Sequence, residues 1–187
     1  LYELVQHEIL DYPSNAAPML FTSNHDENSW NGSAPERLAF ALEPLNAITF
    51  TLNGAPMIYN GQEAGLAKRL PFFEKDAIPW KEDKMFPFYQ KLIQLKKDNP
   101  ALWSPPYGGE FVKLSSEADH QVFAFARVKD AHIAIVIINL SYHPADFNLQ
   151  LKDLKGDYRN IFSNEQVALK EVHHMYLSPW KYAIYTT

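Results

Sequence analysis

The residue types that could do chemistry gather in one short stretch, Phe21-Thr22-Ser23-Asn24-His25-Asp26. An apolar run ends here in an amide, an imidazole and a carboxylate, and Trp30 follows four residues after Asp26. An ionised carboxylate can stabilise positive charge that develops in a transition state, and an imidazole ring can donate or accept hydrogen bonds. The stretch predicts a ligand site, although an aspartate after a strand is also a common turn or capping residue.

A second stretch has a similar layout, Gly54-Ala55-Pro56-Met57-Ile58-Tyr59-Asn60-Gly61-Gln62-Glu63. Taken alone, it predicts the end of a helix, a short strand and a turn. Its polar residues, Tyr59 and Glu63, again come just after the apolar run. The two stretches are informative together, because each places polar side chains directly after the apolar run of a predicted strand.

The elements around these stretches predict a βαβ unit. Residues 18–23 and 56–59 have the apolar runs of short buried strands, covered on both faces. Residues 26–32 between the first strand and the helix are expected to form a loop. A helix then begins at a capping box, in which Ser33 and Glu36 bond each other's backbone N–H groups. Strand, helix and strand in this order require a parallel sheet, whose carboxyl ends carry ligand sites in α/β folds.

The helix after the capping box carries an apolar stripe along one face, and its members are Leu38, Leu42, Leu45, Ile48 and Leu52. Pro44 is expected to kink or divide this helix, and Gly54 is expected to end it in a left-handed conformation. Residues 64–83 predict a long irregular segment. Its aromatic residues Phe72, Phe73 and Trp80 favour packing over ligand contact.

A further helix is predicted at residues 1–10, and another at 87–98 with Phe88, Leu92 and Leu95 facing inward. Lys96 and Lys97 suit the final turn of that last helix, where cations interact well with the helix dipole. After Pro105 the pattern changes to short β-rich segments separated by turns, which predicts an antiparallel β-sandwich. The expected strands are residues 110–115, 121–128, 132–140, 145–149, 157–161, 167–169 and 181–185. We therefore divide the chain into residues 1–104 and 105–187.

Composition limits the function classes. The 187 residues are 47% hydrophobic and carry a net charge of −5, with no cysteine. The charge disfavours nucleic acid and anionic membranes as partners. No stretch approaches the roughly 20 apolar residues of a membrane helix. An acidic, aromatic-rich chain would suit a neutral ligand such as a sugar.

The two stretches together carry a resemblance to a known family. Asn-His-Asp at one strand end, followed by Gly-x-Pro-x-Ile-Tyr-x-Gly-x-Glu at the next, resembles the α-amylase family (glycoside hydrolase family 13). Residues 122–127, 135–141 and 177–185 resemble strands of that family's C-terminal domain. The resemblance implies α/β plus all-β structure: the C-terminal part of a (β/α)8 TIM barrel, then an antiparallel Greek-key β-sandwich. Residues 1–104 would hold the end of barrel unit 6 with units 7 and 8, and residues 105–187 the sandwich.

The resemblance also implies roles for individual residues. Asp26 matches the carboxylate that stabilises the transition state, and His25 matches the imidazole that binds the sugar at the cleaved site. Trp30 could stack on a sugar face, although a packed loop tryptophan is an equal alternative. Asn24, Tyr59 and Glu63 are expected to support the site and not to act chemically.

Retaining glycoside hydrolysis needs two further carboxyl groups, roughly 5 Å apart. In the family these follow strands that this chain does not contain, so we expect the chain alone to be inactive. The expected parent is a retaining hydrolase of α-glucosidic bonds in starch or maltooligosaccharides. No cofactor or metal site is expected in this chain, while calcium would bind elsewhere in the parent.

Two alternatives stay open. One is a non-catalytic carbohydrate-binding or interaction module, and the other is a transglycosylase such as a branching enzyme or a trehalose synthase. The exposed strands and helices of an incomplete barrel also predict that residues 1–104 are either partly disordered or buried in a homo-oligomer, while residues 106–187 fold alone. The compartment is not indicated, although an exported parent would suit a polysaccharide substrate.

Overall fold

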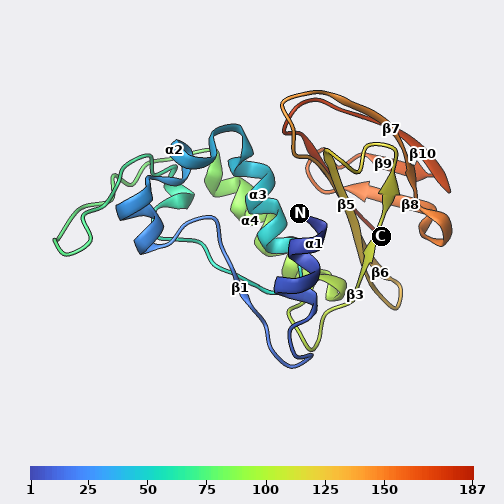
Figure 1. Cartoon of the computed structure of the whole chain (residues 1–187), viewed down its shortest axis with the longest axis horizontal. Helices are drawn as coiled ribbons and strands as arrows, with labels where there is room; N and C mark the ends of the chain where they lie inside the picture. Colours follow the sequence, from blue (N-terminus) through green and yellow to red (C-terminus); the bar gives the residue numbers. More distant parts are fainter.

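The computed structural model describes the backbone of residues 1–187 and every side chain except those of Glu8 and Leu10. Figure 1 shows the helices and β1 on one side and the strands of the second half of the chain on the other. The chain begins with α1 (Tyr2–Val5), which continues directly as the π-helical turn η1 (Gln6–Leu10). A helix over residues 1–10 was predicted and is confirmed. None of the helices in the described part of the chain combines the length and apolar character that a bilayer crossing requires.

The two predicted strands of the βαβ unit are present and parallel. β1 (Met19–Leu20) pairs with β2 (Ala55–Pro56), with Met19 opposite Ala55 and Leu20 opposite Pro56. Both strands are shorter than predicted. Burial on both faces was wrong for the first strand, and the second strand is only partly buried. Met19 is 59% exposed, because β1 has only β2 as a neighbouring strand within the described chain.

The predicted capping box is confirmed. The Ser33 N–H donates to Glu36 Oε2 at 2.7 Å, and the Glu36 N–H donates to Ser33 Oγ at 3.4 Å. Helix α2 (Ala34–Leu38) follows, with a proline in its first turn, where the missing N–H costs little.

The predicted division of the next helix lies earlier than expected. Helix α2 is separated from α3 (Leu42–Thr51) by the 3₁₀ turn η3 (Ala39–Ala41), and Ala39 has the unusual φ of +45°. Pro44 lies inside α3, in its first turn. Because proline has no N–H to donate to the Phe40 carbonyl and its ring collides with that group, the interruption falls one turn before the proline.

Gly54 is needed for space and not for a left-handed conformation, so that prediction was wrong. Its φ is not positive, whereas Gly61 and Gly65 do have positive φ. A Cβ on Gly54 would lie 2.6 Å from the Pro18 carbonyl oxygen and 2.7 Å from the Leu20 side chain. Only a residue without a side chain lets β2 approach β1 this closely.

Residues after β2 first form the 3₁₀ turn η4 (Gln62–Ala64) and then a long irregular segment. This segment extends to the far left of Figure 1, away from the sheets. Helix α4 (Met85–Asp98) begins two residues before its predicted start and ends as predicted, and it buries Phe88, Leu92 and Leu95. The 3₁₀ turn η5 (Pro100–Leu102) then leads into the strands.

The second half of the chain forms two antiparallel sheets. The strands are β3 (Glu110–Lys113), β4 (Ser115–Ser116), β5 (Val122–Lys129), β6 (His132–Asn139), β7 (Ala145–Gln150), β8 (Gly156–Asn160), β9 (Gln166–Leu169), β10 (Val172–Leu177) and β11 (Tyr182–Thr186). A 3₁₀ turn, η6 (Lys152–Leu154), connects β7 and β8. One sheet has the order β3-β5-β6-β11-β8-β9, and the other has the order β10-β7-β4. Strand β10 was missed, because the adjacent His173 and His174 interrupt the alternation of polar and apolar residues that indicates a strand.

The larger sheet is buried on both faces. One face joins the smaller sheet in a core that contains Ala124, Ala126, Ile135 and Ile137. The other face belongs to a core that also contains residues of α3 and α4, and its sheet members are Phe123, Phe125, Ala134, Val136, Ile138 and Ile184. Successive residues of β5 and β6 therefore point into different cores, which explains why both strands are continuously apolar.

Two cations, one buried and one partly buried, lie where the helices meet the sheet. Arg127 of β5 is fully buried, and its guanidinium group donates to the carbonyl oxygens of Thr51 at 3.1 Å and Gly109 at 3.1 Å. Lys96 of α4 donates to the carbonyl oxygens of Leu102 at 2.6 Å and Phe50 at 3.4 Å. Phe50 and Thr51 are the last residues of α3, so both cations lie at the negative end of its dipole.

Candidate functional site

The predicted site residues lie at the start of a helical turn and not in a loop. Residues 25–26 are helical and lead into the π-helical turn η2 (Glu27–Asn31). Asn24 caps this turn, because its Oδ1 accepts a hydrogen bond from the Glu27 N–H at 2.7 Å. The loop predicted for residues 26–32 was wrong, since a capping asparagine followed by residues that tolerate helix is also a helix start.

His25 and Asp26 lie side by side in the first turn. The His25 Nε2 atom is 3.6 Å from the Asp26 Oδ2 atom. Their side chains are 67% and 58% exposed, so both groups can be reached by a ligand from solvent. A carboxylate and an imidazole at this separation can bind neighbouring hydroxyl groups of one molecule.

An aromatic wall borders the imidazole. The Phe72 ring centroid lies 5.6 Å from that of His25 and 5.3 Å from that of Trp30. Phe73 lies 4.8 Å from Phe72, and its side chain is 85% exposed. Trp30, Phe72 and Phe73 therefore form one exposed aromatic surface beside His25, where sequence reasoning expected Phe72 and Phe73 only to pack.

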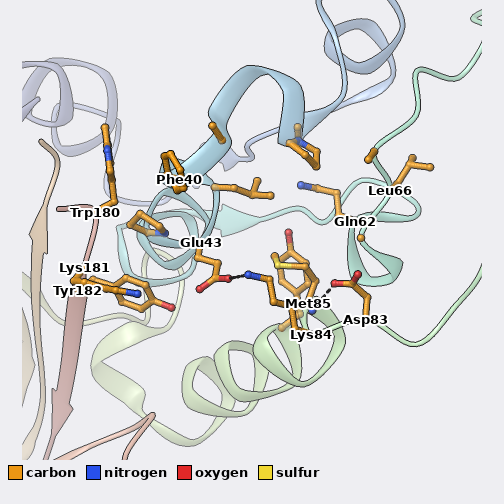
Figure 2. A pocket seen from close by; sticks show the side chains of 18 of the residues that line it. Phe40, Glu43, Gln62, Leu66, Asp83, Lys84, Met85, Trp180, Lys181 and Tyr182 are labelled. Atoms are coloured by element: carbon orange, nitrogen blue, oxygen red, sulfur yellow. Dashed lines mark hydrogen bonds and ion pairs between the residues drawn. The ribbon is translucent and has the colours of Figure 1, made fainter. Parts of the chain in front are cut away.

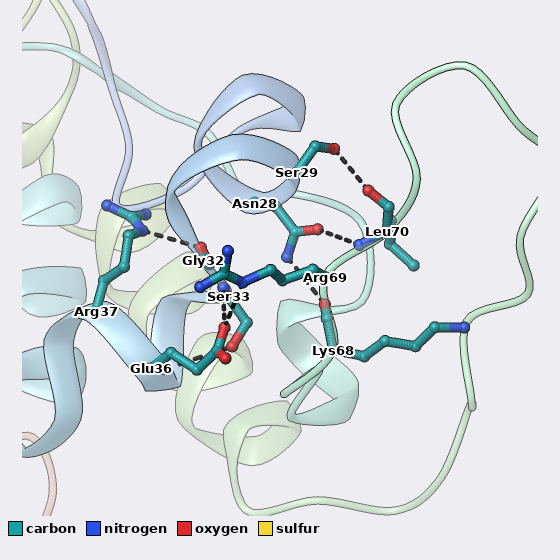
Figure 3. Close-up of polar contacts among 9 residues, drawn as sticks. All are labelled: Asn28, Ser29, Gly32, Ser33, Glu36, Arg37, Lys68, Arg69 and Leu70. Atoms are coloured by element: carbon teal, nitrogen blue, oxygen red, sulfur yellow. Dashed lines mark hydrogen bonds and ion pairs between the residues drawn. The ribbon is translucent and has the colours of Figure 1, made fainter.

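Polar contacts hold the segment that carries Phe72 (Figure 3). The Asn28 side chain donates to the Lys68 carbonyl at 3.1 Å and accepts from the Leu70 N–H at 2.7 Å. Ser29 Oγ donates to the Leu70 carbonyl at 2.7 Å. Two residues of the helical turn thus fix the backbone of residues 68–70, which in turn sets the position of the aromatic wall.

Two arginines strengthen the same region. Arg37 donates to the Gly32 carbonyl at 3.0 Å and lies 3.1 Å from the Glu27 carboxylate. Arg69 lies 3.3 Å from the Glu36 carboxylate (Figure 3). Hydrogen bonds from Ser33, followed by the contact with Arg69, hold the pKa of Glu36 below its usual value. Glu36 therefore stays ionised near neutral pH as part of the scaffold.

A buried glutamine joins the ends of the two parallel strands. Gln62 accepts from the Tyr59 N–H at 2.7 Å and donates to Thr22 Oγ1 at 3.0 Å. Thr22 Oγ1 donates onward to Asn46 of α3 at 2.7 Å. Sequence reasoning missed Gln62; the available signal was an amide directly before Glu63 in the second stretch.

The other predicted supporting residues lie near this connection. Glu63 Oε2 accepts from the Gly61 N–H at 3.0 Å, which stabilises the turn after β2. Tyr59 is partly buried and contributes its backbone N–H to Gln62. Among the side chains that the structure describes, no three His, Cys, Asp or Glu residues gather as metal ligands. The parallel pairing of β1 and β2 therefore brings both sequence stretches to one edge of the sheet.

The chain is similar to known proteins in sequence and in fold. No protein-family model matches the chain. Alpha-amylase 2 of Dictyoglomus thermophilum is 30% identical over 156 residues, which is 76% of this chain and 25% of the relative. The maltogenic α-amylase AmyB of Thermotoga neapolitana has the same fold, with a TM-score of 0.82 at 18% identity over 100% of this chain and 45% of that one. AmyP in complex with maltose gives a TM-score of 0.71 at 17% identity, over 100% of this chain and 44% of that one.

The relatives are named as α-amylases, which are glycosidases of carbohydrate metabolism. The chain belongs to the α-amylase family, glycoside hydrolase family 13. It spans about a quarter of the length of the curated relatives it matches.

Proposed function

We propose that this chain is the C-terminal part of a longer retaining α-glucan hydrolase. In this proposal, β1 and β2 are the last two strands of a (β/α)8 barrel, and the two antiparallel sheets are a Greek-key sandwich that follows it. Residues 1–104 then belong to the catalytic domain and residues 105–187 to the sandwich. The observation that carries the proposal is the parallel register of β1 and β2, since it brings residues 24–26 and 59–63 to one sheet edge.

Asp26 has the geometry of a transition-state stabiliser. Its carboxylate is exposed beside His25 and has no lysine or arginine partner among the described side chains, so it can face a sugar ring that develops positive charge. Such a contact strengthens as the charge develops and therefore accelerates the reaction more than it tightens substrate binding. His25 would hold a hydroxyl group of the same sugar, and Trp30 with Phe72 would cover its apolar face.

The proposed parent supplies the nucleophile and the acid/base from other segments. Neither role falls to Glu63, whose carboxylate is already bonded to the Gly61 N–H. The chain by itself is therefore expected to bind sugar weakly and to hydrolyse nothing. α-Glucans are the proposed substrate, in line with the maltose in the AmyP structure of the same fold. No cofactor is proposed in this chain, and calcium in the parent stays a prediction.

The test is an Asp26→Asn substitution in the parent protein. We expect kcat on maltooligosaccharides to fall about 10²- to 10³-fold, the usual effect of removing one transition-state contact. Because Asp26 is exposed, the fold should be unaffected, which circular dichroism can check. Asp153→Asn is the matched control, since Asp153 is exposed in the second half of the chain, and it should leave kcat unchanged.

Product analysis separates the alternatives. Shortened maltooligosaccharides support a hydrolase, whereas new linkages would make the parent a transglycosylase. If wild-type parent binds maltooligosaccharides and turns over none, it is a non-catalytic module. If Asp26→Asn retains wild-type kcat, the role proposed for Asp26 is wrong.

A further inference from the structure

A cleft that is separate from the His25–Asp26 pair lies between the helices and the sheets. Its volume is about 700 Å³, within the range of small-molecule sites. Residues from η3 and the start of α3 form one wall, and the start of α4 forms the floor. The turns before β7 and β11 supply the other wall through Tyr142 and Trp180. Figure 2 shows Trp180 and Tyr182 on one side of this cleft and Gln62 and Leu66 on the other.

Exposed aromatic rings line the cleft. Phe40 is 75% exposed and Tyr142 is 73% exposed, although both are large apolar groups. Tyr142 and Trp180 meet edge to face, with ring centroids 5.1 Å apart and planes at 84°. Rings held in this way offer flat surfaces to the C–H groups of a sugar, and Phe40 supplies a third ring on the opposite wall.

Polar groups lie between these rings. Glu43 and Lys84 form an ion pair at 2.6 Å across the middle of the cleft (Figure 2). The Tyr89 hydroxyl and the Trp180 indole N–H are buried and have no hydrogen-bond partner among the described residues. Burial raises the pKa of the Tyr89 hydroxyl, so this group stays a neutral donor. An unbonded buried donor is costly, and a ligand hydroxyl group would satisfy it.

Two strained residues lie on opposite walls. Ala39 has a φ of +45° and Trp180 a φ of +57°, and both line the cleft. A positive φ on a residue other than glycine costs free energy, and such residues cluster at ligand-binding positions. The surrounding fold thus holds the two walls in position despite a local cost.

We infer that this cleft is a second α-glucan site, which binds a maltooligosaccharide between Phe40 and the Tyr142–Trp180 pair. The inference rests on the proposed function for the choice of ligand. Aromatic faces alternate with a carboxylate, an ammonium group and unbonded donors, which matches a molecule with apolar ring faces and many hydroxyl groups. Leu66 and Ala67 line this cleft, and the residues that follow them, Lys68 and Leu70, are bonded to Asn28 and Ser29, so one continuous segment connects both sites.

The test measures binding of maltoheptaose to the parent protein by isothermal titration calorimetry, in an Asp26→Asn background that slows turnover. We expect two sites. Tyr142→Ala should weaken one of them by roughly fivefold to tenfold, the effect of one aromatic contact. The hydroxyl and ring of Tyr142 are exposed, so this substitution should not disturb folding. Tyr176→Ala is the matched control, since Tyr176 is 61% exposed on β10 and lies outside the cleft.

The outcomes are distinct. A single maltoheptaose site, or equal affinities in the Asp26→Asn protein with and without Tyr142→Ala or Tyr176→Ala, would overturn the second site. Hydrolysis of maltotriose by the wild-type parent is measured separately and reports on the proposed function. Turnover without a second site would therefore contradict the cleft alone, and absence of both turnover and maltoheptaose binding would contradict both proposals.

Discussion

At the scale of single residues, Gln62 connects more of the candidate site than any residue that the sequence pattern singled out. Its side chain bonds the backbone after β2 and the Thr22 hydroxyl after β1, and it is only 7% exposed. His25 and Asp26 face solvent, so their positions depend on buried groups of this kind. The chemistry would be done by exposed residues, and the geometry is set by a buried amide.

Gln62→Leu should therefore destabilise the protein although it conserves the size of the side chain. The Tyr59 N–H loses its partner in a partly buried position, which costs about 1–3 kcal/mol in the free energy of unfolding. Urea titration of the parent protein measures the change. Gln94→Leu is the control, because Gln94 is exposed on α4 and bonds only Asp98, and its effect should stay within about 0.5 kcal/mol. Equal costs for the two substitutions would contradict the role given to Gln62.

Much of the candidate site could be predicted from the sequence, and the missing part has a physical cause. His25, Asp26 and Trp30 were found because polar and aromatic residues at a strand end are a local pattern. The contacts of Phe72 with His25 and Trp30 were not found, because they depend on how residues 68–70 bond Asn28 and Ser29. No short-range pattern encodes a contact between segments so distant in the chain.

At the scale of elements, the backbone at Gly54 lies close against the backbone at Pro18 in the βαβ unit. The end of α3 and the start of β2 pass directly over the Pro18 carbonyl, and the Ala55 N–H donates to that carbonyl at 2.9 Å. The sequence indicated a glycine with a structural role here but not which role. A left-handed turn and a close approach of two backbones both require glycine, and the two roles are distinguished only by the φ angle and the space around the Cα atom.

Gly54→Ala should disrupt the pairing of β1 with β2. The added Cβ would lie 2.6 Å from the Pro18 carbonyl oxygen, so backbone must shift, and we expect a loss of more than about 2 kcal/mol in the free energy of unfolding. Gly156→Ala is the matched control, because its Cβ would meet only the Tyr158 ring at 3.6 Å, an ordinary contact. Thermal unfolding of both variants measures the difference, and a stable Gly54→Ala protein would show that the strands can separate at little cost.

The same scale explains which elements were easy to predict. The capping box at Ser33 and Glu36 and the inward face of α4 follow from local spacing, and both are confirmed. Strand β10 was missed because its exposed positions hold His174 and Tyr176, whose partners lie across the sheet on β7. Whether such a segment forms a strand or a loop depends on its pairing with another strand, and the spacing of residues within the segment does not show that pairing.

At the scale of the whole molecule, the helices and the larger sheet pack around one core, and the cations of Arg127 and Lys96 lie where they meet. Lys96 lies in the last turn of α4, as predicted, and its ammonium group also bonds the carbonyls of Phe50 and Leu102. Burial, and then the nearby Arg127, lower the pKa of Lys96 to about 8. In the unfolded chain the same lysine has a pKa near 10.5.

These pKa values predict a stability that rises with pH. Below pH 8, Lys96 is charged in both states and its burial penalty is present in full. As pH rises from about 8 towards 10.5, the folded chain releases this proton while the unfolded chain keeps it, so the free energy of unfolding increases. Between pH 7.5 and 9.5 the contribution is on the order of 2 kcal/mol. Lys96→Met should remove this increase in urea titrations at the two pH values.

Lys97→Met is the control for this measurement, because Lys97 is adjacent but exposed. It should keep the wild-type increase with pH. An unchanged increase in Lys96→Met would mean that another group is responsible, and Arg127 is a poor candidate, since burial lowers its pKa only to about 10.

The predicted boundary near Pro105 stays a prediction, and so does the homo-oligomer. Because the helices and the larger sheet share a core, residues 106–187 alone would expose Phe123, Phe125 and Val136.

The buried guanidinium group of Arg127 limits how this chain can exchange parts with its relatives by recombination. A crossover between residues 104 and 110 would join α3 of one parent to β5 of another. If the incoming strand lacked a cation at this position, the carbonyls of Thr51 and Gly109 would be left without their donor inside the protein. Exchange at this point is expected to succeed only between relatives that carry the same arginine, so we expect the two halves of the chain to be compatible only when both come from such relatives.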